Sequence, residues 1–179
     1  MMKNYGHKFL LLSLLSGSGV YQASADPVQV NITGKVIASP CTLDTANSTL
    51  SVDLGDIQAT ALGTAGTYGG SEKFFNLVLN NCPATTSKVT ATFSGTPYDA
   101  DNNFFANSGT ATGVGIKIKT FAEPYTGTTV RPTSSTWTVA VNAATKSATL
   151  AFATKAYTAT GNATPGSINS VMQVAFTYQ

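Results

Sequence analysis

The chain has 179 residues, a length typical of one domain, and only 10% of them are charged, against about 25% in an average soluble domain. Ten basic and eight acidic residues leave a formal charge of +2. This sparse charge argues against a nucleic-acid partner, because neutralising phosphates requires clustered Lys and Arg.

The first 25 residues have the pattern of a secretory signal peptide. Lys3 and Lys8 supply a basic start, residues 9–15 are apolar, and Ala23-Ser24-Ala25 is a small-residue cleavage motif. The apolar run is shorter than the roughly 20 residues of a membrane-spanning helix, so we expect cleavage after Ala25 and no membrane insertion. The remaining chain then carries eight basic and eight acidic residues and no histidine, because His7 is removed.

The loss of histidine excludes Ser-His-Asp and Cys-His catalysis within this chain. A zinc site is disfavoured for the same reason. Asp53 and Asp56 form a carboxylate pair, but a position beside Gly55 favours a turn over glycoside hydrolysis. We therefore expect no enzyme, no catalytic or metal site and no cofactor.

Two cysteines, Cys41 and Cys82, remain in a chain directed to an oxidising compartment. An even cysteine count in that setting predicts a disulfide, and the wide spacing is unlike a redox-active C-x-x-C pair. We expect a structural Cys41–Cys82 bridge.

Alternation of apolar and polar residues predicts β-strands along the whole mature chain. No stretch shows a helical apolar face. The expected strands, in chain order, are residues 28–36, 51–57, 75–79, 89–93, 116–119, 137–141, 148–156 and 170–178.

Turn-forming residues separate these runs, at 63–70, 95–103, 123–135 and 158–166. Many short alternating strands without helices between them indicate an all-β, antiparallel sandwich.

The first and last predicted strands are both apolar on one face, and on that face neither carries the charges or prolines that blunt an exposed sheet edge. The two strands either pair with each other inside one sheet or pair with another chain by β-augmentation. The sequence alone leaves both possibilities open.

The mature chain resembles the pilin subunits of chaperone–usher fimbriae. The resemblance rests on an N-terminal alternating extension with Gly34 in its apolar series and on a final strand whose penultimate residue is Tyr178. Between them come, in the family's order, Pro40-Cys41-Thr42, Val52-Asp53-Leu54-Gly55-Asp56, Asn81-Cys82-Pro83 and Val89 to Gly95. Residues 31–54 are most similar to minor tip-adaptor pilins of type 1 fimbriae.

The resemblance implies an incomplete immunoglobulin-like β-sandwich that lacks its last strand. It divides the chain into a signal peptide (1–25), an N-terminal donor-strand extension (26–37) and a pilin domain (38–179). The implied donor residues are Val28, Val30, Ile32, Gly34 and Val36. The implied acceptor groove and chaperone contact comprise Met172, Val174, Phe176 and Tyr178.

The function implied is that of a structural or adaptor subunit, polymerised by donor-strand exchange and contributing to bacterial adhesion. Its partners would be neighbouring pilin subunits, a periplasmic chaperone and an outer-membrane usher, and its route would lead through the periplasm to the fimbrium on the bacterial surface. A single-domain secreted adhesin, which binds host carbohydrate or protein through its loops, is the alternative.

Overall fold

The computed structural model describes residues 29–125 and 129–179. Residues 29–35 belong to a separate N-terminal unit, and residues 36–179 form the second compact unit, called the domain below. The predicted signal peptide and Val28 lie outside the described residues. Residues 29–35 have no regular secondary structure.

The domain is built from antiparallel strands, which confirms the all-β prediction. Within the described ranges there is no α-helix and one short 3₁₀ turn, η1 (Ala59–Leu62). The strands are β1 (Thr42–Leu43), β2 (Thr67–Asn80), β3 (Lys88–Gly95), β4 (Pro97–Tyr98), β5 (Asp101–Ala106), β6 (Gly115–Thr120), β7 (Thr129–Val130), β8 (Thr133–Ala140), β9 (Ala148–Thr158) and β10 (Met172–Tyr178).

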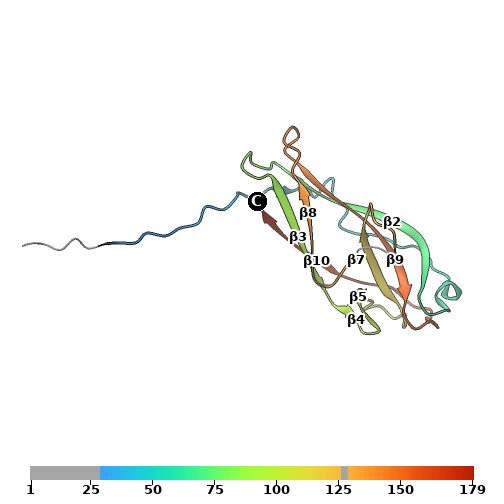
Figure 1. Cartoon of the computed structure of the whole chain (residues 1–179). Coiled ribbons are helices and arrows are strands. Elements are labelled where there is room, and N and C mark those ends of the chain that lie inside the picture. The colour runs from blue at the N-terminus through green and yellow to red at the C-terminus, as the bar shows by residue number, and fades with distance from the viewer. Residues whose placement is uncertain (1–28, 126–128) are drawn as a thin grey trace, which may run out of the picture. The chain divides into compact units, whose positions relative to one another are not determined.

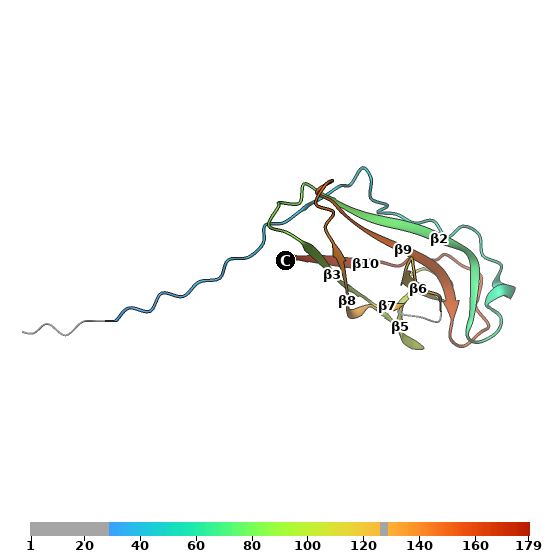
Figure 2. The same cartoon turned by 45° about the horizontal axis from the view of Figure 1, so that its top comes forward.

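The strands form two sheets. The larger has the order β1-β2-β9-β6-β5-β4, with β7 added beside β6, and the smaller has the order β10-β3-β8. Figures 1 and 2 show β3, β8 and β10 together on one side of the domain, and β2 and β9 together on the other. β10 is therefore the last chain element and also an edge strand.

The inward faces of both sheets supply the core. Phe75 and Phe152 are register partners on β2 and β9, and their rings stack with centroids 4.9 Å apart. Phe93 of β3 and Trp137 of β8 reach the Phe152 ring from the smaller sheet, with centroids at 5.6 and 5.3 Å. Trp137 is thus a core anchor, as its position in an alternating strand predicts.

Three predicted loops contain strands. β2 begins at Thr67, inside the expected loop 63–70, because the chain bulges between Gly69 and Lys73 and continues pairing with β9. β4 and the first half of β5 lie in the expected loop 95–103, and β7 and the start of β8 lie in 123–135. Residues 51–57, expected as a strand, have no regular secondary structure. Gly, Asn and Thr locally favour loops, but in these segments pairing with neighbouring strands decides the secondary structure.

β6 has the predicted alternation, with Ile116 and Ile118 in the core and Lys117 and Lys119 on the opposite face. Both lysines are nevertheless buried, each only 5% exposed. The segment after β6 folds back over them, and Phe121 donates its N–H to Ala151 O of β9 at 2.9 Å. The sheet's outer face therefore carries a small second layer at this point.

Candidate functional site

The free edge of β10 is the first component of the site. β10 pairs with β3 along all seven of its residues, and within residues 29–125 and 129–179 no strand pairs with its other edge. Such an edge presents unpaired N–H and C=O groups. Met172, Val174 and Phe176 alternate along the strand as half-buried side chains packed against the core, so their apolar faces lie beside this open backbone.

Residues 49–57 form the opposite wall. Thr49 donates its N–H to Asn76 O of β2 at 2.8 Å, and in the described parts of the chain no backbone-to-backbone hydrogen bond involves residues 50–57. The backbone turns at Gly55, which has a φ of +70°. The Gly55 N–H donates a hydrogen bond to the Asp53 carboxylate at 2.8 Å. The wall is therefore a second length of backbone that is open to pairing.

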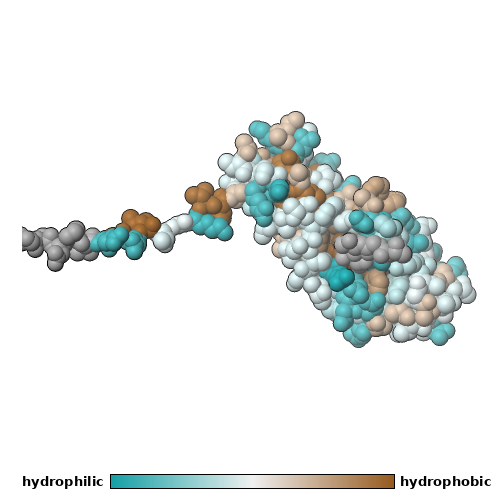
Figure 3. All heavy atoms as spheres, in the orientation of Figure 1, coloured by the Kyte–Doolittle hydropathy of each residue, from teal (hydrophilic) through white to brown (hydrophobic). Residues whose placement is uncertain are grey.

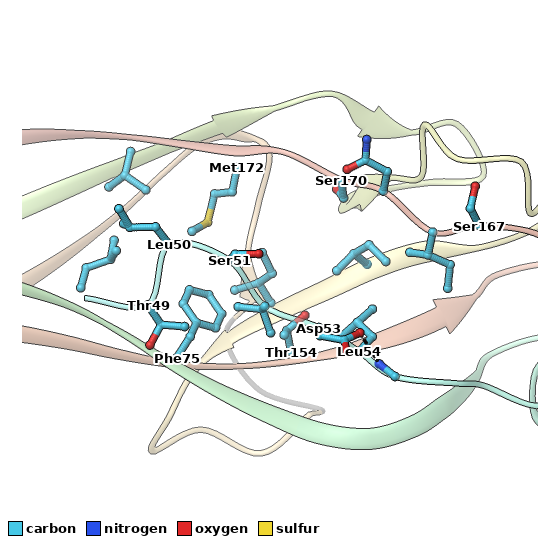
Figure 4. A pocket seen from close by; sticks show the side chains of 18 of the residues that line it. Thr49, Leu50, Ser51, Asp53, Leu54, Phe75, Thr154, Ser167, Ser170 and Met172 are labelled. Atoms are coloured by element: carbon cyan, nitrogen blue, oxygen red, sulfur yellow. Dashed lines mark hydrogen bonds between the residues drawn. The ribbon is translucent and has the colours of Figure 1, made fainter. Parts of the chain in front are cut away.

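A groove of about 950 Å³ separates β10 from this wall. Phe75 and Leu77 of β2 and Ile118 of β6 contribute to its lining from the larger sheet. Figure 4 shows Met172 on one side and Leu50 and Ser51 on the other. Protein interiors seldom contain voids larger than a water molecule, so a groove of this size, with apolar side chains between two open backbones, has the form of a missing strand.

Of the implied acceptor residues, Met172, Val174 and Phe176 line the groove, whereas Tyr178 does not. The Tyr178 hydroxyl instead donates to Cys41 O at 3.4 Å, and burial raises the pKa of this phenol. Tyr178 therefore connects the end of β10 to the start of the domain.

The disulfide joins Cys41 to Cys82 and closes a separation of 41 residues. It ties the entry into the domain to the end of β2. Thr86 adds a hydrogen bond from its hydroxyl to Ser39 O at 2.7 Å. The point at which the N-terminal extension leaves the domain is thus fixed by a covalent bond and by local hydrogen bonds.

The implied donor residues that the structure describes are exposed. Val30 is 74%, Ile32 92% and Val36 99% exposed, and a Cβ added to Gly34 would meet no atom within 4 Å. Figure 3 shows brown, apolar spheres along this extension, interrupted by teal polar ones, whereas the domain face in view is mostly pale or teal. Large apolar side chains in such exposure are typical of a surface that is covered in a complex.

Sequence reasoning did not identify the opposite wall, or the groove residues of the larger sheet, as parts of the site. Val52 and Leu54 line the groove, although the sequence indicated only a strand over 51–57, and Leu50 lines it from just before that range. Nothing local marks Phe75 and Leu77 as groove residues, because they alternate like any core strand. They line the groove because, among the described residues, no strand lies above them.

Among the described residues, no group of three or more His, Cys, Asp or Glu side chains is placed to hold a metal ion. In the same residues no helix has the length and apolar character needed to cross a bilayer. What the site offers is a groove that combines apolar side chains with two lines of backbone donors and acceptors, which is suited to binding an extended peptide.

Comparison with known proteins agrees with this geometry. The family described as "Fimbrial protein" matches residues 30–179. Protein FimG of Escherichia coli K12 is 36% identical over 171 residues, which cover 95% of each chain. The type-1 fimbrial protein A chain of Salmonella typhi is 31% identical over 172 residues, covering 89% of each.

Among solved structures, the P pilus rod subunit PapA superposes with a TM-score of 0.61 at 19% identity, covering 84% of this chain and 100% of that one. This likeness confirms the expected immunoglobulin-like sandwich. The chain therefore belongs to the fimbrial protein family, and it is a structural pilin of the chaperone–usher class.

Proposed function

We propose that the chain polymerises by exchanging strands, with residues 26–37 as the donor extension and residues 38–179 as the accepting domain. The extension of one subunit would enter the groove of the next and pair with both β10 and residues 49–57. The observation that carries this proposal is the open groove between these two unpaired backbones.

The donor and the groove are matched in length. Residues 28–36 and residues 49–57 contain the same number of residues, and a strand of this length spans about 30 Å. Alternation matters as much as length, because a slip of one residue would turn every apolar side chain away from the groove. Val28, Val30, Ile32, Gly34 and Val36 would face inward in the productive register.

Burial of the donor would contribute most of the free energy. Covering Val30, Ile32 and Val36, which are all exposed in the free extension, is worth about 1.5–3 kcal/mol each as an upper estimate. Three such side chains approach the whole stability of an average domain, about 5–15 kcal/mol. The complemented subunit should therefore be far more stable than the free one.

An open groove is an aggregation hazard during export. We assign its protection to a periplasmic chaperone that covers Met172, Val174 and Phe176, with Tyr178 at the end of the contact. A signal peptide at residues 1–25 would direct the chain to the periplasm, and an outer-membrane usher would pass it to the fimbrium on the cell surface. The role is that of a non-enzymatic structural or adaptor subunit that contributes to bacterial adhesion.

A peptide of residues 28–36 tests the proposal directly. Added to the purified chain, it should raise the midpoint of thermal unfolding by ten degrees or more, since about 1 kcal/mol shifts a domain of this size by roughly 2–4 °C. The control is a peptide of the same composition in which apolar and polar residues exchange places, which shifts the alternation by one. Equal midpoints with and without the native peptide would refute strand acceptance.

Deletion of residues 26–36 tests donation separately. The shortened subunit should still accept the peptide but should fail to join a fibre as a donor. Immunogold labelling should therefore detect it only at a position where a subunit donates no strand to a neighbour. Normal incorporation of the deletion variant along the fibre would contradict the donor assignment.

A further inference from the structure

One end of the groove is closed by a connection between the two sheets, here called the clasp. It consists of residues 107–112, which join β5 to β6, and residues 164–169, which precede β10. Ser167, Ile168 and Asn169 of the second segment line the groove. Figure 4 shows Ser167 and Ser170 at the far end of the groove from Thr49 and Phe75.

Asn107 is the centre of the clasp, and its side-chain amide donates two hydrogen bonds and accepts two. Oδ1 accepts the N–H of Asn169 at 2.7 Å and that of Gly109 at 2.9 Å. Nδ2 donates to Ala111 O at 2.8 Å and to Ser167 O at 3.3 Å. Because donors meet carbonyls and the acceptor meets N–H groups, the amide has one consistent orientation.

A reciprocal pair of hydrogen bonds supports this centre. The Ser167 N–H donates to Thr110 Oγ1 at 2.8 Å, and the Thr110 N–H donates to Ser167 Oγ at 3.1 Å. Gly109 and Gly166 let the two backbones touch, since a Cβ on either would collide with Ser167 O or Ala111 N respectively. The clasp is therefore a specified contact and not a loose crossing of two loops.

These hydrogen bonds fix the position of the Ile168 side chain. Its neighbours Ser167 and Asn169 are both bound by Asn107, and Ile168 itself packs against both apolar clusters of the domain while lining the groove. Its position in the groove therefore depends on the hydrogen bonds of Asn107.

We infer that Asn107 is a positioning residue for strand acceptance: it holds Ile168 at the end of the groove, so that this end is preformed for the last apolar residue of the incoming strand. The inference rests on the proposed function. It predicts an effect that is local to one end of the bound strand, which distinguishes it from a general contribution of Asn107 to folding.

The test measures dissociation constants of three peptides for the mature chain. The peptides are residues 28–36, residues 30–36 and residues 28–34, so each shortened form lacks one end. Asn107→Ala should weaken the peptides of residues 28–36 and 30–36, which keep Val36, about tenfold, and should leave unchanged the peptide of residues 28–34, which lacks it. Asn103→Ala is the matched control, because within residues 29–125 and 129–179 the Asn103 side-chain amide hydrogen-bonds only to the Asp101 side chain, and it should change none of the three constants.

A variant with a smaller change covers the case in which Asn107→Ala does not fold. Thr110→Val keeps the shape of the side chain but removes the acceptor for the Ser167 N–H, and it should give the same pattern with a smaller loss. An equal loss for all three peptides, or no loss for any, would overturn the role of Asn107. Failure of all three peptides to bind the unaltered chain would instead refute strand acceptance itself, and the role of Asn107 with it.

Discussion

Lys117 donates a hydrogen bond from its ammonium group to the backbone carbonyl of Tyr125, and the same ammonium lies 5.9 Å from the centre of the Tyr125 ring. Lys119 and Lys155 approach this ring as well, at 5.0 and 5.7 Å. Lys119 is also paired with Glu72 at 3.2 Å. A cluster of lysines thus surrounds one tyrosine on the outer face of the larger sheet, on the side away from the groove.

Replacing Lys117 by Met should change how stability depends on pH. Burial lowers the pKa of the Lys117 ammonium below its ordinary value of 10.5. Between the lowered pKa and 10.5 the unfolded chain binds more protons than the folded one, so Lys117 makes the unaltered chain gain stability as pH rises. The free energy of unfolding of the unaltered chain, relative to Lys117→Met, should therefore increase from neutral pH towards pH 10.

Denaturant unfolding of both proteins at several pH values measures this difference. Lys155→Met is a control from the same cluster, because Lys155 is only half-buried. A constant difference between Lys117→Met and the unaltered chain across the range would show that burial of Lys117 does not shift its titration.

Tyr125→Phe should leave the free energy of unfolding at neutral pH within about 0.5 kcal/mol of the original. The Tyr125 hydroxyl is buried, and no residue of the described ranges forms a well-shaped hydrogen bond with it, so its removal leaves no partner unsatisfied. Tyr125→Ala should cost about 1–3 kcal/mol, because the ring that covers the lysines is lost. Similar losses for Phe and Ala would contradict this account.

Alkaline pH separates the same variants further. Burial first, and the nearby Glu72 carboxylate second, raise the pKa of Tyr125. Above pH 10 the unfolded chain loses this proton while the folded chain keeps it, so stability falls with pH. Tyr125→Phe should show a shallower fall above pH 10 in the same unfolding measurements.

Much of the fold follows from local alternation. The strands around Val89, Ile116 and Leu150 are found where apolar residues recur at every second position, because each buries one face in a single core. The expected bridge between Cys41 and Cys82 is present, and it follows from the count of two cysteines in an exported chain.

What the sequence could not predict depends on long-range geometry. β2 continues through Gly69 and Gly70, which locally indicate a loop, because β9 offers a partner beyond the bulge. Lys117 and Lys119 alternate as exposed residues would, yet a later segment covers them. Asn107 reads as an ordinary loop residue, since its partners Ser167 and Asn169 lie about sixty positions away.

Removing the disulfide should destabilise the domain strongly. Replacing Cys41 and Cys82 together by Ala opens a loop with a separation of 41 residues, for which the chain-entropy estimate is about 3–5 kcal/mol. Comparison with the oxidised chain by denaturant unfolding measures the loss. An unchanged free energy of unfolding would mean that the hydrogen bonds of Thr86 and Tyr178 hold this end of the domain without the bridge.

Charge placed in the groove should block strand acceptance without unfolding the free subunit. Val174→Lys puts an ammonium on the groove face of β10, where a bound strand would bury it without a counter-charge. The rise in unfolding midpoint caused by the peptide of residues 28–36 should disappear. Ala175→Lys, on the exposed face of the same strand, should keep the full rise. Retention of the full rise in Val174→Lys would show that the peptide binds elsewhere.

Gly34→Val should separate folding from donation. An added side chain at position 34 meets no atom within 4 Å in the free extension, so the midpoint of thermal unfolding of the subunit should not change. In the proposed complex this residue would face the groove, and glycine within a strand is typical of close approach by another chain. A peptide of residues 28–36 that carries Gly34→Val should therefore bind the groove at least about tenfold more weakly. Thr33→Val, at the neighbouring outward position, is the control and should bind as the native peptide does. Equal affinity of the Gly34→Val and native peptides would show that the groove has room at this position, and that Gly34 is not required for register.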